Sequence, residues 1–172
     1  GQFEEAIRSG SMENMIHSVE PRAGQSIFIP SGRLHAIGAG MLIYEIQQNS
    51  DTTYRVFDWN RVGLDGRPRD LHVRESLASI DFTDYEPSMD QPEGQNLATC
   101  QHFKVDFLEL PPGTTICNPD PDRFSIITVT NGEIQDKRGN VYSTGDFLLL
   151  PRGPVALDAV KSTSLLQTTL PH

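Results

Sequence analysis

The stretch that decides the fold runs from Gly24 to His35 and reads GQSIFIPSGRLH. A second copy, GDFLLLPRGPVA, runs from Gly145 to Ala156 and agrees at every position that shapes the backbone. In each copy a glycine opens a turn, five mostly apolar residues follow, and then come proline, any residue, glycine, two residues and a variable site. The copies lie 121 residues apart, which is too long for a solenoid repeat and suits one small domain per copy. The pattern predicts two related β-units, of which only the first keeps a candidate metal ligand, His35.

Each copy has the features of a strand that enters a β-barrel. The opening glycine permits a turn with positive φ, and the apolar runs 27–29 and 147–150 suit a buried strand. The proline that follows ends the strand, because it donates no hydrogen bond. The next glycine lets the chain bend back, so His35 should start the following strand and point into the barrel mouth. This order of residues resembles the second conserved motif of the cupins.

The whole chain is therefore predicted to be mainly β, with cupin-type (jelly-roll) β-barrel units, one incomplete and one degenerate, and a few peripheral helices. Residues 1–82 should form the C-terminal part of a metal-binding cupin domain with helical segments. Residues 83–96 are polar and proline-containing, which is typical of a linker. Residues 97–172 should form a second cupin-like domain that lacks metal ligands.

Local patterns predict the individual elements. Apolar residues recur at helical spacing in 2–19 and 70–80, and Asp70 is the expected N-cap of the second helical segment. Short apolar runs separated by turn residues predict strands beyond the linker. The predicted strands span residues 103–110, 124–130, 147–150 and 164–169.

The composition narrows the classes of protein to which this chain can belong. With 172 residues, 37% of them apolar, the chain can hold one large or two small domains with a real core. Its net charge of −9 argues against general nucleic-acid binding, because phosphate backbones need a basic surface. No apolar run approaches the length of a membrane span, and no charged-then-apolar leader begins the chain. We therefore expect a soluble, cytoplasmic protein without a membrane partner.

Basic residues gather in one segment of this acidic chain. Five of the 14 Lys and Arg residues fall within residues 55–74, beside three acidic residues. The planar fork of arginine suits a phosphate or carboxylate group, so the segment is a candidate anion site. The alternative is a solvated surface loop, since charge clusters are usually solvated faces.

Two segments carry a more specific pattern. Residues 30–61 and 69–77 read PSGRLHAIGAGMLIYEIQQNSDTTYRVFDWNR and RDLHVRESL, and they closely resemble the class I mannose-6-phosphate isomerases in their short bacterial form. The resemblance covers nearly the whole chain, is dense from Gly24 to Leu77, and thins to general cupin features after the linker. That family interconverts mannose 6-phosphate and fructose 6-phosphate with zinc. The resemblance therefore implies a phosphorylated hexose as ligand and zinc as cofactor.

The resemblance also implies roles for single residues. His35 matches a zinc ligand, Arg55 matches the arginine held essential to catalysis, and Glu45 matches an acidic residue proposed for proton transfer. Arg61 and Arg69 are further candidates for binding the phosphate. The chemistry needs such groups, because an aldose-ketose exchange moves a proton between neighbouring carbons through an enediol. It requires a base, a cation near the oxygens and a grip on the phosphate.

Ordinary structural interpretations stand beside these roles. His35 could be a turn histidine, Glu45 could face solvent, and Arg55 could pair with Asp58. The zinc site is also incomplete, because catalytic zinc takes about three protein ligands. Cupins supply the others from an earlier motif that has no counterpart in this chain. The chain thus corresponds to roughly the C-terminal half of the enzyme, with His35 as its one candidate ligand.

Three interpretations remain open from the sequence. The chain could be a truncated isomerase that is inactive by itself, a non-catalytic cupin module that binds a sugar phosphate or scaffolds a partner, or an enzyme that becomes active after assembly. If the first barrel lacks its opening strands, the strands around Ile27 and Ile43 present unpaired edges. We therefore expect a homo-oligomer, a dimer or larger, that associates through these exposed edges.

Overall fold

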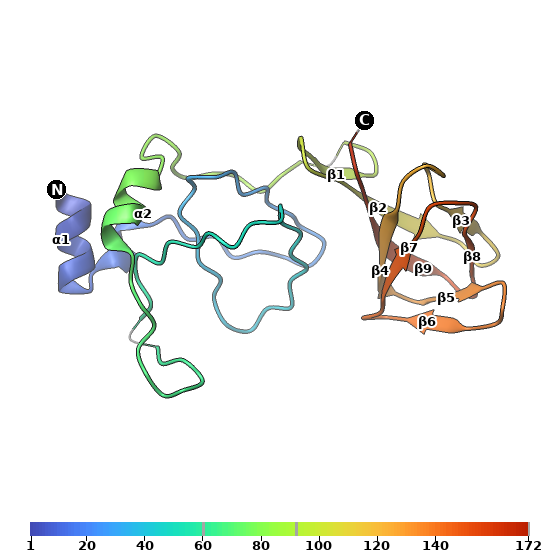
Figure 1. Cartoon of the computed structure of the whole chain (residues 1–172), viewed down its shortest axis with the longest axis horizontal. Helices are drawn as coiled ribbons and strands as arrows, with labels where there is room; N and C mark the ends of the chain where they lie inside the picture. The colour runs from blue at the N-terminus through green and yellow to red at the C-terminus, as the bar shows by residue number, and fades with distance from the viewer. Residues whose placement is uncertain (60, 92, 172) are drawn as a thin grey trace. The chain divides into compact units, whose positions relative to one another are not determined.

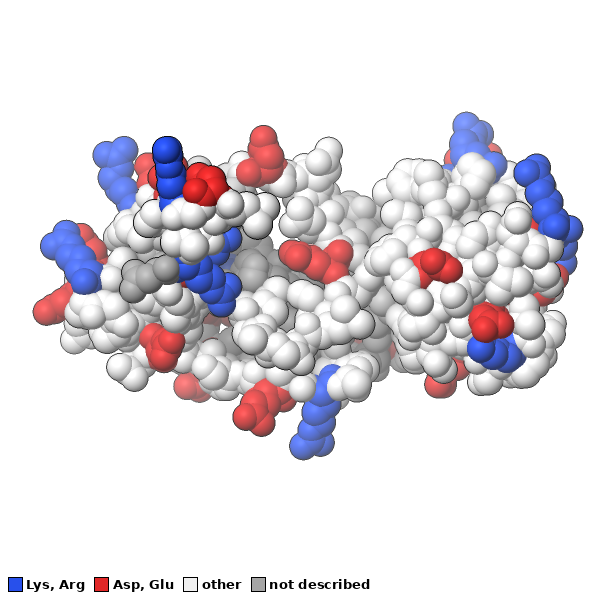
Figure 2. Space-filling model, turned by 90° about the horizontal axis from the view of Figure 1, so that it is seen from below, with Lys and Arg blue, Asp and Glu red and all other residues white. Residues whose placement is uncertain are grey.

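The computed structural model describes residues 1–59, 61–91 and 93–171. The chain divides into two compact units, Gly1–Met89 and Asp90–His172, and the division falls inside the segment 83–96. Within the described part of the chain, no helix combines the length and the apolar character that a membrane crossing requires. On the face shown in Figure 2, Lys and Arg side chains are interspersed with Asp and Glu side chains.

The second unit consists of two antiparallel sheets (Figure 1). One sheet has the strand order β1-β2-β9-β4-β7 and the other has the order β3-β8-β5-β6. The strands are β1 Asn96–Thr99, β2 Lys104–Leu110, β3 Thr115–Cys117, β4 Ser125–Asn131, β5 Glu133–Asp136, β6 Val141–Ser143, β7 Phe147–Leu150, β8 Ala156–Ala159 and β9 Thr163–Thr169.

This strand order is that of a jelly roll. Apart from the β5–β6 hairpin, consecutive strands from β2 onward alternate between the two sheets. The resulting orders, β2-β9-β4-β7 and β3-β8-β5-β6, form the double Greek key that cupins share with other jelly rolls. The mainly β, cupin-type fold predicted from the sequence is therefore confirmed. The four predicted strands appear as β2, β4, β7 and β9, with ends within one residue of those expected.

The core of this unit lies between the sheets. Because successive side chains in a strand alternate between its two faces, Ile127 and Val129 of β4 share the inner face with Leu165 of β9. All three are at most 1% exposed. The full set of buried core residues is Leu110, Ile116, Ile127, Val129, Ile134, Leu150, Leu157, Ala159 and Leu165.

The second copy of the repeated motif has the predicted local structure. Gly145 and Gly153 both adopt left-handed backbone conformations, with φ of 98° and 110°. Between them lies β7, and Ala156 at the variable site begins β8. The turn, strand, turn order read from the sequence is thus observed in this unit.

The first copy keeps the turns but not the strand. Gly24 and Gly32 are left-handed, with φ of 87° and 91°, as in the second copy. However, residues 24–57 contain no strand, so the prediction of short strands in this segment is wrong for this structure. The pairing of β7 with β4 suggests the reason. An offset of 121 residues places β4 onto residues 4–10, which belong almost entirely to helix α1, so the first copy finds no strand beside it.

The regular elements formed by the described residues of the first unit are short helices. They are α1 Gln2–Ser9, the 3₁₀ helix η1 Met12–Met15, and α2 Val73–Ser79. The predicted helical region 2–19 therefore ends at Met15, because its C-cap, Ile16, is extended. The N-cap of α2 is His72 and not Asp70, which corrects the predicted start of that helix.

Both α1 and α2 pack onto one small core in this unit. Its buried members come from α1, from η1 and from the irregular segment that contains Val56. They are Ala6, Ile7, Met12 and Val56, with Phe3, Ile16, Leu34, Phe57, Val73 and Leu77 packed around them. This core brings the end of α1 against residues 56–57 and so positions the arginine-rich segment that follows.

Candidate functional site

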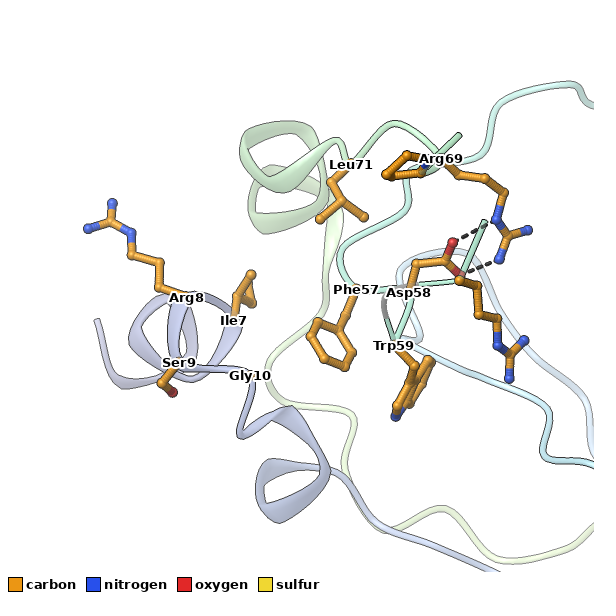
Figure 3. Close-up of a pocket in the computed structure, with 11 residues that line it drawn as sticks. Ile7, Arg8, Ser9, Gly10, Phe57, Asp58, Trp59, Arg69 and Leu71 are labelled. Atoms are coloured by element: carbon orange, nitrogen blue, oxygen red, sulfur yellow. Dashed lines mark hydrogen bonds and ion pairs between the residues drawn. The ribbon is translucent and has the colours of Figure 1, made fainter. Parts of the chain in front are cut away.

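A buried carboxylate, Asp58, lies at the centre of the arginine-rich segment. Asp58 is only 8% exposed. Arg69 donates two hydrogen bonds to it: Nε to Oδ2 at 2.6 Å, and Nη2 to Oδ1. Figure 3 shows this forked pair, with two of the three guanidinium nitrogens directed at the carboxylate. A bidentate arginine-carboxylate pair fixes the geometry of both groups.

Three arginines act on this one carboxylate. The hydrogen bond from Arg69 lowers the pKa of Asp58 below its ordinary value of 3.8, against the opposing effect of burial. The positive charges of Arg69, Arg55 and Arg61 lower the pKa of Asp58 further. In turn, Asp58 raises the pKa of the Arg69 guanidinium. The segment therefore carries more positive charge than Asp58 neutralises, as an anion site requires.

Arg55 is held beside the start of α2. Its backbone N–H donates to Nδ1 of His72 at 3.3 Å, and its carbonyl accepts the N–H of His72 at 2.7 Å. The half-buried side chain donates through Nη1 to the carbonyl of Asp70 at 3.3 Å. In this structure the carboxylate of Asp58 pairs with Arg69, so the alternative in which Asp58 pairs with Arg55 is not observed.

The other two predicted residues, His35 and Glu45, are exposed and lie outside the arginine-rich segment 55–74. His35 is exposed, and its Nδ1 lies 3.1 Å from the carbonyl oxygen of Arg33. No strand forms at residue 35, so the predicted barrel mouth around His35 is absent from the described structure. Glu45 is exposed as well. Arg61 and Arg69 line a cavity, which is described below, but His35, Glu45 and Arg55 do not line it.

The residues present do not fit a zinc site. Among the described residues, no group of three or more His, Cys, Asp or Glu side chains is arranged to hold a metal ion. A catalytic zinc needs about three protein ligands, and the single imidazole of His35 cannot supply them. No chemical step is therefore assigned to zinc in this chain.

A cavity of about 540 Å³ adjoins the Asp58–Arg69 pair (Figure 3). One wall comes from the end of α1 and the other from residues on either side of Asp58 and Arg69. The lining residues are Ile7, Arg8, Ser9, Gly10, Phe57, Asp58, Trp59, Arg61, Pro68, Arg69 and Leu71. The sequence pointed to Arg61 and Arg69, but not to α1 or Trp59. The aromatic residues Phe57 and Trp59 stand two positions apart within the basic segment, and this pattern could have indicated Trp59. No local pattern indicated α1.

The Asp58–Arg69 pair should make the first unit sensitive to acid. Because the folded-state pKa of Asp58 is lowered, the pair stabilises the fold above the unfolded pKa, and this stabilisation is lost as the pH falls through the folded pKa. We expect Asp58→Asn to unfold at a lower temperature than the wild type at neutral pH. Between about pH 5 and pH 2, its melting temperature should fall less steeply than that of the wild type.

Thermal unfolding followed by circular dichroism across this pH range measures the effect. The control is Asp51→Asn, at an exposed position that has no ion-pair partner among the described residues. If the acid slopes of Asp58→Asn and the wild type coincide, the pair does not stabilise the fold.

Comparison with known proteins gives the relatives of this chain. No protein-family model matches it. It is 32% identical over 157 residues to mannose-6-phosphate isomerase ManA of Bacillus subtilis (strain 168), which covers 86% of this chain and 49% of that protein. It is 41% identical over 76 residues to the mannose-6-phosphate isomerase of Streptococcus mutans serotype c (strain ATCC 700610 / UA159), covering 44% of this chain and 24% of that protein.

A solved structure supports the fold. The crystal structure of the mannose 6-phosphate isomerase from Bacillus subtilis matches with a TM-score of 0.55 and 21% identity, over 72% of this chain and 42% of that chain. At this identity the match shows a shared fold and no more. The chain spans about half the length of the Bacillus subtilis protein ManA. The resemblance read from residues 30–61 and 69–77 is confirmed: this chain is a relative of the bacterial mannose-6-phosphate isomerases and matches about half the length of such a protein.

Proposed function

We propose that this chain provides the sugar-phosphate-binding part of a mannose-6-phosphate isomerase, which interconverts mannose 6-phosphate and fructose 6-phosphate. The similarity to ManA of Bacillus subtilis over 86% of the chain carries this proposal. The three arginines around Asp58 support it independently, because a phosphate dianion needs a site with surplus positive charge.

Arg55 is the residue that we assign to the reacting part of the sugar. Its charge lies close enough to Asp58 to affect the carboxyl, and its backbone bonds to His72 hold it in place. A fixed guanidinium can stabilise the negative charge that develops on the enediolate oxygens. Glu45 remains the proposed proton carrier, and His35 the proposed contribution to a metal site. The structure gives neither residue a partner that supports these two roles.

The chain by itself should bind the ligand without converting it. Phosphate binding by arginines that solvent can reach should be weak and should weaken further with added salt, because solvent and ions screen the charges. Turnover requires groups that orient the sugar oxygens, and the described residues do not provide a metal site for that purpose.

The test combines calorimetric binding of fructose 6-phosphate with an isomerase assay in the presence of added zinc. We expect weak, salt-sensitive binding that falls in Arg55→Ala, and no turnover. The matched control is Arg74→Ala, which removes an exposed arginine of α2 from the same basic segment. Zinc-dependent turnover that Arg55→Ala abolishes would show that the chain completes a metal site. Absence of both binding and turnover would instead favour a scaffolding cupin module.

A further inference from the structure

The cavity beside α1 differs from a solvated surface loop because two segments that are remote in the sequence line it. The residues Ile7–Gly10 at the end of α1 face a second wall that contains Phe57, Trp59 and Leu71. Its volume of about 540 Å³ lies within the range of ordinary small-molecule sites. Figure 3 shows Ile7, Phe57 and Leu71 on one side of the close-up, with Asp58, Arg69 and Trp59 beyond them. An apolar surface thus adjoins a charged one, as in sites that bind amphipathic ligands.

Among the three arginines that line this cavity, Arg61 is the one available to bind a ligand. Arg69 donates two guanidinium hydrogen bonds to the carboxylate of Asp58, and Arg8 pairs with Glu4 at 2.7 Å. Figure 3 shows the side chain of Arg8 directed away from Trp59. Arg61 is exposed and has no ion pair among the described residues. Its donors can therefore reach an added anion without breaking an existing bond.

Trp59 supplies a fixed aromatic surface beside Arg61. The indole N–H donates to Oε1 of Glu13 at 2.6 Å, and Phe57 contacts the ring edge to face at 5.1 Å between centroids. The guanidinium of Arg61 lies 5.7 Å from the indole centroid. Contacts on two sides thus hold the indole in place, while 38% of the residue remains exposed.

The backbone at Trp59 is also strained. Its φ of 47° is in the left-handed region, which is unfavourable for a large side chain. Strained residues persist only where the surrounding structure imposes them, and they cluster at ligand sites. At Trp59 the strain accompanies a ring held next to an unpaired guanidinium. This combination matches a clamp for a ligand that carries both a ring and a negative charge.

We propose that this cavity binds a phosphate-bearing ring compound, with Arg61 contacting the phosphate and Trp59 contacting the ring. The Asp58–Arg69 pair joins two of the residues that line this cavity and so helps to position the site. Two sources share this ligand chemistry, a hexose phosphate and a nucleoside monophosphate. The inference takes its first probe from the proposed function but does not require isomerase activity.

The chain contains one tryptophan, so its fluorescence reports directly on this cavity. The purified chain is titrated with fructose 6-phosphate, adenosine 5′-monophosphate, mannose and inorganic phosphate, and calorimetry is run in parallel. We expect one of the two phosphorylated ring compounds to change the Trp59 emission and to bind more tightly than mannose or inorganic phosphate. Arg61→Gln should weaken that binding by roughly tenfold or more, because charged hydrogen bonds to the phosphate are lost.

Two further variants keep the result interpretable. Arg67→Gln removes an exposed arginine from the same loop that does not line the cavity, and it should bind as the wild type does. Arg61→Lys keeps the charge but loses the planar fork, so its affinity should fall between those of the wild type and Arg61→Gln. Circular dichroism establishes that each variant keeps the wild-type fold.

Several outcomes would overturn the inference. If inorganic phosphate binds as tightly as both ring compounds, the cavity is a simple anion site. If the Trp59 emission stays unchanged with every probe, none of these compounds binds beside Trp59 and the proposal is wrong. Fructose 6-phosphate that binds by calorimetry, depends on Arg55, and affects neither Trp59 nor the Arg61→Gln affinity would exclude this cavity while leaving the proposed function intact.

Discussion

Gly132→Ala should destabilise the second unit severely, by roughly 3 kcal/mol or more in the free energy of unfolding. Gly132 links β4 to β5 with a φ of 91°, where an L side chain costs about 1 to 2 kcal/mol. A Cβ at this position would also lie 2.5 Å from the carbonyl oxygen of Ser162 and 2.7 Å from Cα of Thr163. These are backbone atoms at the start of β9, so relief of the clash requires a shift of a central strand.

The control for this prediction is Gly113→Ala. Gly113 is left-handed too, with φ of 79°, but a Cβ there would meet nothing within 4 Å. Gly113→Ala should therefore lose only the backbone contribution, about 1 to 2 kcal/mol. Urea unfolding followed by circular dichroism compares the two variants. If both variants lose the same free energy of unfolding, the backbone around Ser162 moves at little cost and the close packing at Gly132 is not required.

Leu165→Ala should lower the free energy of unfolding of the same unit by about 2 to 5 kcal/mol. Leu165 is fully buried, and its strand β9 lies between β2 and β4 at the middle of the larger sheet. Truncation leaves a cavity that neighbours such as Ile127 and Val129 can fill only by moving. The cost therefore combines the lost transfer free energy with that of the cavity.

The matched control is Leu149→Ala in the edge strand β7. Leu149 is 65% exposed, so the same truncation there should change stability by no more than about 0.5 kcal/mol. Both variants are compared by urea unfolding at one protein concentration. A small loss for Leu165→Ala would contradict the assignment of β9 to the centre of the core.

Local sequence was sufficient to predict the β class, four strands and the repeated turns of the second unit. The strands β2, β4, β7 and β9 appear where short apolar runs stand between turn residues. Gly145 and Gly153 adopt the left-handed conformations that the repeated motif requires. These predictions hold because each rests on a property of a few consecutive residues. The partner strands are also present in the same unit, so local preference and tertiary pairing agree.

The same motif was insufficient in the first unit. Gly24 and Gly32 make the expected turns, but the apolar run between them remains irregular. A strand is stable only when its backbone groups pair with a neighbour, and the residues equivalent to β4 belong to α1. Ile27 and Ile29 therefore have side chains that favour a strand, but they form none in this structure because no neighbouring strand pairs with them.

The sequence by itself determined the jelly roll of residues 96–169, the left-handed turn glycines, and the gathering of arginines between residues 55 and 74. Only the tertiary structure decided how those arginines are used. Asp58 pairs with Arg69, and the end of α1 lines a cavity together with Trp59. The indole of Trp59 donates a hydrogen bond to Glu13 of η1, which is 46 residues away. Ion pairs and cavities depend on distances between residues that are remote along the chain. Spacing in the sequence specifies such distances only where a regular helix or strand connects the residues. The described residues between 24 and 72 form no such element.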